Sequence, residues 1–134
     1  MVTVAYKAED GPTYQCRLES EFANSIDRRL VAIILELADF MLAAYQKTLT
    51  ITCLVRTTEE NAAVGGGQYS AHLHGRAVDI RLHDLEDYQG RVMLGHVKAL
   101  WAEDFLYALA HGEGSNHHLH LNITRKYARE ITRD

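Results

Sequence analysis

Residues 70–79 read SAHLHGRAVD, and they combine a glycine turn with the start of an alternating segment. Apolar and polar residues alternate from 76 to 82, which predicts a strand with Val78 and Ile80 on a core face and Asp79 on the other face. His72 precedes the glycine and Asp79 follows it. We therefore expect a loop nitrogen and a strand carboxylate to converge on one point.

A second histidine pattern, His118-Leu119-His120, lies nearer the end of the chain. Side chains alternate between the two faces of a strand, so His118 and His120 share a face that Leu119 and Leu121 do not. Two nitrogens and one carboxylate oxygen suit zinc, and three protein ligands leave a position open for catalysis. The other histidines outside this segment have no partner at ligand spacing: His74, His83, His96 and His111.

The spacing S-x-H-x-x-G-x-A-x-D is met without a mismatch by Ser70, His72, Gly75, Ala77 and Asp79. This signature resembles that of the zinc D-alanyl-D-alanine carboxypeptidases and of the L-alanyl-D-glutamate endopeptidases of phage endolysins. Their fold, which they share with the hedgehog signalling domain, is a small α+β domain with an antiparallel sheet. The resemblance extends over roughly residues 30–123.

The resemblance implies a Zn²⁺ ion held by His72, Asp79 and His120, and a peptide substrate in or derived from the bacterial cell wall. It also places an arginine that binds the substrate carbonyl or carboxylate at Arg56, which follows a strand expected over 49–55. The serine-glycine-tyrosine that usually precedes this arginine is absent. Three residues beside the histidine turn are expected to line the substrate cleft: Gln68, Tyr69 and Ser70.

The general base has three candidates. Family members place an acidic residue three positions before the last zinc histidine, and His117 occupies that position here. His118 shares the face of His120 and resembles a histidine that assists catalysis in several of these enzymes, so we favour it. His117 would need a bulge to turn toward the site. Glu113 would need its glycine-containing loop to fold over the site, because a base must reach the water that it activates.

Composition predicts one domain spanning residues 1–134. Of these residues 47% are hydrophobic and 24% are charged, which excludes the disordered class. A net charge of −4 with scattered Lys and Arg disfavours nucleic acid, and the apolar runs are too short to span a membrane. Cys16 and Cys53 lack metal spacing and are expected to be small buried residues. The sequence has no signature of an oligomeric state.

The order of patterns predicts an α+β fold with a small, mostly antiparallel sheet and two main helices. The first eighteen residues alternate around Asp10-Gly11-Pro12, from Val2 onward, and predict a hairpin. A loop is expected over 56–70, and the charged tail 124–134 is expected to be a short helix or frayed. The helices are expected over 26–46, capped by Ser25, and over 85–101; the remaining strands are expected over 76–82, 105–110 and 119–123.

These patterns favour a zinc metallopeptidase that hydrolyses peptidoglycan stem peptides or small D-amino-acid peptides. The alternative is a catalytically silent, zinc-containing binding module on the same fold, motivated by the missing acid at position 117. A non-haem iron oxygenase is disfavoured, because its first histidine and carboxylate usually lie two residues apart. The N-terminal residues carry no export signal, so we expect synthesis in the cytoplasm and either release to the wall by a phage-type lysis route or action on cytosolic dipeptides.

Overall fold

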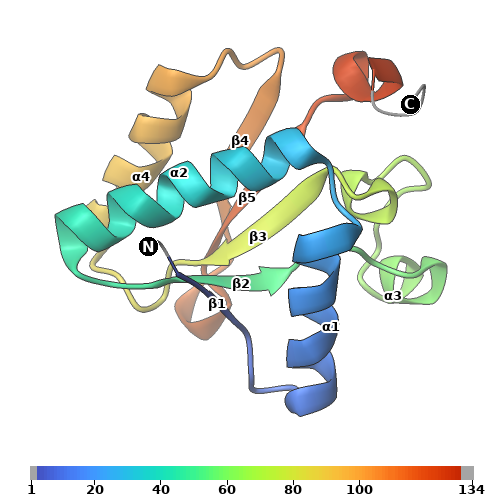
Figure 1. Ribbon diagram of the computed structural model, residues 1–134, viewed down its shortest axis with the longest axis horizontal. Helices are drawn as coiled ribbons and strands as arrows, with labels where there is room; N and C mark the ends of the chain where they lie inside the picture. Colours follow the sequence, from blue (N-terminus) through green and yellow to red (C-terminus); the bar gives the residue numbers. More distant parts are fainter. Residues whose placement is uncertain (1–2, 131–134) are drawn as a thin grey trace.

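The computed structural model describes residues 3–130, and within them one sheet has the strand order β1-β2-β3-β5-β4 (Figure 1). Only the pair β1 and β2 is parallel; the other neighbours are antiparallel. This arrangement confirms the α+β class with a mostly antiparallel sheet. The strands are β1 (Val4–Tyr6), β2 (Leu49–Cys53), β3 (Ala77–Arg81), β4 (Leu106–His111) and β5 (His118–Ile123).

The two expected main helices are α2 and α4, which contact each other and pack beside β2 and β4 respectively (Figure 1). No helix among residues 3–130 has the length and apolar character needed to cross a membrane. The α-helices are α1 (Pro12–Asn24), α2 (Arg28–Tyr45), α3 (Thr58–Ala63) and α4 (Asp87–Leu100), and the short 3-10 helices are η1 (Ala71–His74), η2 (Gly114–Asn116) and η3 (Arg125–Glu130).

The sheet has one face in the core and one face that carries the polar side chains of interest. Val78 and Ile80 of β3 are fully buried with Leu119 and Leu121 of β5, as strand alternation predicts. Burial of such aliphatic side chains contributes about 1.5–3 kcal/mol each. The core side is completed by the apolar positions of α2, which include Leu30, Ile34, Leu37 and Met41.

The expected N-terminal hairpin is wrong in its second half, because residues 12–24 form helix α1. Pro12 stands at the first helical position, where its fixed φ and missing N–H suit a helix start. Tyr14, Leu18 and Phe22 recur at the helical spacing of four, and Leu18 is 1% exposed. The helical spacing of these apolar residues therefore decides the structure of this segment, and the alternation of period two does not. Val2, which was expected in the first strand, lies outside the described residues.

Two further local expectations need correction. Helix α2 is capped by Asp27, whose side chain accepts a hydrogen bond from the Arg29 N–H at 2.9 Å, and Ser25 instead ends α1. The expected loop over 56–70 contains helix α3, which begins with a capping box between Thr57 and Glu60. The tail forms the short helix η3, as one of its two expected outcomes, and residues 131–134 lie outside the described part of the chain.

Candidate metal centre

Strand pairing brings Asp79 next to His120. The two residues are register partners between β3 and β5, and Cys53 of β2 is the partner of Asp79 on its other side. His72 comes from η1, which ends at Gly75 in the left-handed conformation (φ 69°). A Cβ at position 75 would lie 2.6 Å from the Ser25 carbonyl oxygen, so the turn that carries His72 into the site requires glycine there.

The His72 ring is fixed with one nitrogen free. Its Nδ1 donates a hydrogen bond to the Leu54 carbonyl oxygen at 2.7 Å. Its Nε2 is buried without a hydrogen-bond partner and lies 3.3 Å from Asp79 Oδ1. Metal-bound histidines usually donate a hydrogen bond from their second ring N–H to a carbonyl or carboxylate in this way. The unpartnered Nε2 is therefore suited to bind a metal ion.

His120 approaches the same carboxylate oxygen from β5. Its Nδ1 lies 3.0 Å from Asp79 Oδ1, and its Nε2 lies 2.8 Å from Asn122 Oδ1, which can accept the second ring proton. Ligand atoms on a tetrahedron with bonds of about 2.0 Å are about 3.3 Å apart, close to the separations seen here. His72 and His120 each place one nitrogen at about this separation from Asp79 Oδ1, and the three residues fit a zinc ion in donor type.

The same three groups stabilise one another in the metal-free protein. Burial alone would raise the pKa of Asp79, but the neighbouring His120 and His72 hold that pKa well below its usual range. Burial would lower the pKa of His72, whereas Asp79 and Cys53 together raise it to about 10. The carboxylate is therefore ionised and ready to bind a cation.

Cys53 is the residue of this centre that sequence reasoning missed. It is only partly buried and Cys16 is exposed, so the expectation of two buried cysteines is wrong. Ligand atoms of Cys53, His72 and Asp79 lie within 4.8 Å of one another, which would also suit a metal ion. However, the Cys53 Sγ lies 3.6 Å from His72 Nδ1, the nitrogen that already serves Leu54. His120 completes the triad without breaking that hydrogen bond.

Arg56 lies in the cavity of about 740 Å³ that Asp79 also lines. One of its terminal nitrogens is 3.9 Å from Asp79 Oδ2. Its backbone N–H donates to the His72 carbonyl oxygen at 3.1 Å, which connects the segment after β2 to η1. The guanidinium therefore lies beside the triad, where the resemblance placed it.

The three candidate bases occupy different positions. His118 Nδ1 donates to the Asn116 carbonyl oxygen at 2.8 Å, and its Nε2 lies 3.9 Å from Asp79 Oδ2. His117 precedes β5, and its ring atom Cε1 lies 3.8 Å from where a Cβ would stand at Gly90, so its ring packs toward α4. Glu113 precedes η2 and is exposed. Of the three, His118 has its ring nitrogen directed at the triad.

Two of the three residues expected to line the substrate cleft lie outside the cavity of Asp79. Gln68 and Tyr69 line a second cavity of about 400 Å³, and no residue lines both this cavity and the one that contains Asp79. Ser70 precedes η1 and makes no capping hydrogen bond through its side chain. These three residues stay predictions as substrate contacts.

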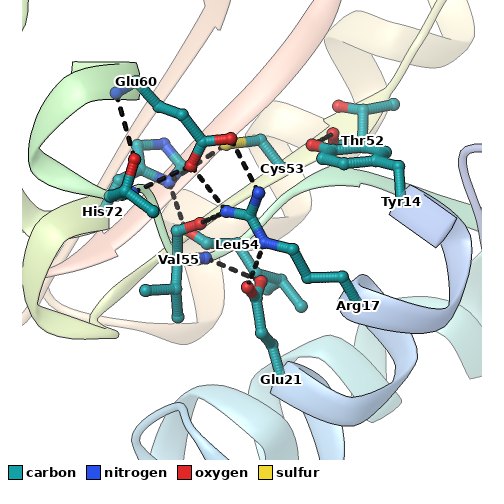
Figure 2. A network of polar contacts seen from close by, with 10 residues as sticks. Tyr14, Arg17, Glu21, Thr52, Cys53, Leu54, Val55, Glu60 and His72 are labelled. Carbon is teal, nitrogen blue, oxygen red and sulfur yellow. Dashed lines mark hydrogen bonds and ion pairs between the residues drawn. The ribbon is translucent and has the colours of Figure 1, made fainter. Parts of the chain in front are cut away.

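Helix α1 holds the segment that supports His72 and Arg56 (Figure 2). Arg17 binds both carboxylate oxygens of Glu60 at 2.7 Å, Glu21 Oε2 at 2.8 Å and the Val55 carbonyl oxygen at 2.7 Å. Glu21 Oε1 accepts the Val55 N–H at 3.1 Å. Both backbone polar groups of Val55 are thereby fixed, one residue from the Leu54 carbonyl that orients His72. Because α1 was not predicted, these contacts of Arg17 and Glu21 were not predicted either.

A small α+β domain that brings a histidine of a short helix, η1, together with a histidine and an aspartate of its sheet, beside an arginine, defines a class of protein with a candidate centre for a divalent metal. The family model described as Peptidase M15 matches residues 15–107, more than half of the chain, and the chain therefore belongs to the Peptidase M15 family. This membership confirms the resemblance and indicates a zinc-dependent hydrolytic metallopeptidase. Searches of curated proteins and of solved structures gave no match. The matched region contains Arg56, His72 and Asp79, whereas His120 joins them through strand pairing.

Proposed function

We propose that this protein hydrolyses peptide bonds in peptidoglycan stem peptides or in small D-amino-acid peptides, as a D,D-carboxypeptidase or an L-Ala-D-Glu endopeptidase does. The observation that carries the proposal is the convergence of His72 Nε2 and His120 Nδ1 on Asp79 Oδ1, each ring having its other nitrogen engaged. A zinc ion at this triad would supply Lewis acidity, which polarises a carbonyl group and lowers the pKa of water. Family membership supports the same reaction class.

Arg56 is proposed to bind the substrate. Three other cations that line the cavity are already paired: Lys7 with Asp10, Arg17 with Glu60, and Arg81 with Glu9. Arg56 has a longer contact, 3.9 Å, with the carboxylate that a metal ion would share. Its guanidinium can therefore accept a substrate carboxylate or stabilise the oxyanion that forms during peptide hydrolysis.

His118 is proposed to transfer the proton. Because its Nδ1–H is held by the Asn116 carbonyl, its Nε2 carries the lone pair and faces the Asp79 side of the cavity. Nε2 would take the proton from the attacking water and return it to the leaving amine. His117 lines the same cavity with its ring against Gly90, and Glu113 is exposed before η2; neither has the fixed orientation that the Asn116 carbonyl gives His118.

The test is mass spectrometry of purified muropeptides after incubation with zinc-loaded protein. Loss of a terminal D-alanine identifies a carboxypeptidase, and separation of L-alanine from D-glutamate identifies an endopeptidase. Asp79→Asn, which keeps the shape of the side chain but removes its charge, is the matched inactive control. A folded, zinc-loaded protein that releases neither product from muropeptides or from D-alanyl dipeptides across a pH series would contradict the proposal.

A silent zinc-binding module is the second candidate, and one observation favours it. The position three residues before His120 is held by His117 in place of an acidic residue, and its ring packs against Gly90 at the wall of the cavity that Asp79 lines. Stoichiometric zinc without turnover of any of these peptides would support this reading. For an active enzyme, we further propose synthesis in the cytoplasm and access to the wall through a phage-type lysis route. Detection of the protein outside intact cells before lysis would contradict that route.

A further inference from the structure

The second cavity is separate from the metal centre. It lies between the loop at residues 68–69, the end of η1 and the helix η3, and it shares no lining residue with the cavity of Asp79 and Arg56. Its volume is about 400 Å³. The side chains that line it are those of Gln68, Tyr69, His74, Arg76, Arg125 and Ala128.

The charge of this cavity is unbalanced. Two arginines line it, and none of its described lining residues is acidic, although the chain as a whole has a net charge of −4. The first cavity differs, because most of its cations are paired with carboxylates. A cavity with two guanidinium groups and no described carboxylate favours an anionic ligand.

Arg76 is the buried arginine among the residues that line this cavity. Arg76 is 6% exposed, and one of its terminal nitrogens donates a hydrogen bond to the Ile123 carbonyl oxygen at 2.6 Å. A guanidinium has five N–H donors, and a buried charge is costly unless it is paired. Among the side chains that the structure describes, no carboxylate lies within 4.0 Å of it; Asp27 acts on it from farther away and is itself paired with Arg29. Burial and the charge of Arg125 both lower the pKa of Arg76.

Arg125, the second arginine of this cavity, is held against the ring of Tyr69. Its guanidinium carbon lies 4.0 Å from the centre of the Tyr69 ring, a cation–π contact that fixes this otherwise exposed side chain. A planar guanidinium matches the two oxygens of a carboxylate or a phosphate. We propose that this cavity is a second ligand site, which binds a phosphate or carboxylate group between Arg76 and Arg125.

The proposal is tested by nuclear magnetic resonance on ¹⁵N-labelled, zinc-loaded protein. One series adds sodium phosphate and a second adds sodium acetate, both at constant ionic strength. We expect saturable shifts of the backbone amides of Tyr69, His74 and Arg125, and the series with the tighter isotherm identifies the group. Signals of Asp79 and His120 report separately on any binding at the metal centre. Shifts that grow without saturation in both series would overturn the proposal.

Variants distinguish this site from general electrostatic attraction. Arg125→Gln should weaken the affinity about tenfold, the size of one charge-assisted hydrogen bond. Arg91→Gln removes an exposed charge of helix α4, outside both cavities, and should leave the affinity unchanged. Equal weakening by the two substitutions would overturn the proposal. Neither result depends on peptidase activity, because no residue of the metal triad lines this cavity.

Discussion

The metal triad and the segment that precedes β5 differ in how firmly their side chains are held. At the triad, His72 and His120 come from a glycine-closed turn and a strand, and the second nitrogen of each ring is engaged. In the segment 112–117, Gly112 and Gly114 have positive φ, residues 113–116 are exposed, and the ring of His117 lies against α4. The difference is that ligand groups are fixed before any ligand arrives, whereas the groups near the proton-transfer position are only partly fixed.

This contrast follows from what each function requires. Metal ligands must be held at set distances, and supporting groups such as the Leu54 carbonyl provide that order. A proton-transfer group must reach both an attacking water and a leaving amine, so some freedom is useful. His118 lies at the boundary of the two regions, at the first residue of β5. Four substitutions test the contrast.

Removal of Asp79 should have the largest effect. Its Oδ1 is the atom on which both histidines converge, so Asp79→Ala should abolish stoichiometric zinc binding and hydrolysis together. Zinc content by elemental mass spectrometry and muropeptide hydrolysis are the measurements. Asp104→Ala, which removes an exposed carboxylate paired with Lys126, should preserve both properties. An Asp79→Ala protein with one tightly bound zinc would show that the triad is not the metal centre.

Removal of the His118 imidazole should separate catalysis from metal binding. His118→Gln should retain zinc, while kcat for muropeptide cleavage falls about 10²–10⁴-fold, the usual contribution of a general base. The matched control is His83→Gln, which changes another histidine of the same cavity, one paired with Asp84. If His118→Gln keeps full activity while His117→Gln or Glu113→Gln loses it, the segment 112–117 and not β5 supplies the base.

Removal of the Arg17 guanidinium of α1 should weaken the metal triad indirectly, through the segment that supports His72. Arg17→Gln loses its bonds to Glu60 and Val55, so the Leu54 carbonyl should orient His72 less well. We expect zinc affinity, measured by chelator competition, to fall about tenfold, at the lower end for outer-shell changes. Arg28→Gln, at an exposed arginine bonded to Ala23, should not change it. A lower melting temperature with unchanged zinc affinity would restrict Arg17 to a structural role.

The smallest effect should come from Glu60. Hydrogen bonds from Arg17 and Thr57 lower the pKa of Glu60 from 4.5 to about 2, so the folded state favours its ionised form. The resulting stability is complete above pH 4.5 and is lost as the pH falls toward 2. Thermal melts should show Glu60→Gln less stable than wild type by a few degrees at neutral pH, with the difference vanishing near pH 2. Because the side chain is 41% exposed, solvent screening keeps this difference small.

The exposed neighbour Glu59 provides the control for that measurement. Glu59→Gln removes a carboxylate from the same first turn of α3 without touching Arg17. Its melting temperature should follow that of the wild-type protein at every pH. A Glu60→Gln difference that stays constant down to pH 2 would mean that the pair with Arg17 does not stabilise the folded state.

Local periodicity made much of the sheet predictable. The alternation through Val78, Asp79 and Ile80 determined which side chains enter the core, and that through His118 to Ile123 did the same for β5. The period of α1 was ambiguous, because Tyr14, Cys16 and Leu18 fit a strand while Tyr14, Leu18 and Phe22 fit a helix. Short segments of this kind are decided by the core that they meet.

By itself, the sequence determined the sheet-rich α+β class, the glycine turn and the face on which Asp79 and His120 lie, because strand phase and turn chemistry act over a few residues. Only the tertiary structure decided that Cys53 lies beside His72, that Arg17 holds the segment before Arg56, and that Gln68 and Tyr69 line a different cavity. These contacts join residues far apart in the chain. Their existence depends on how the elements pack, which no local pattern encodes.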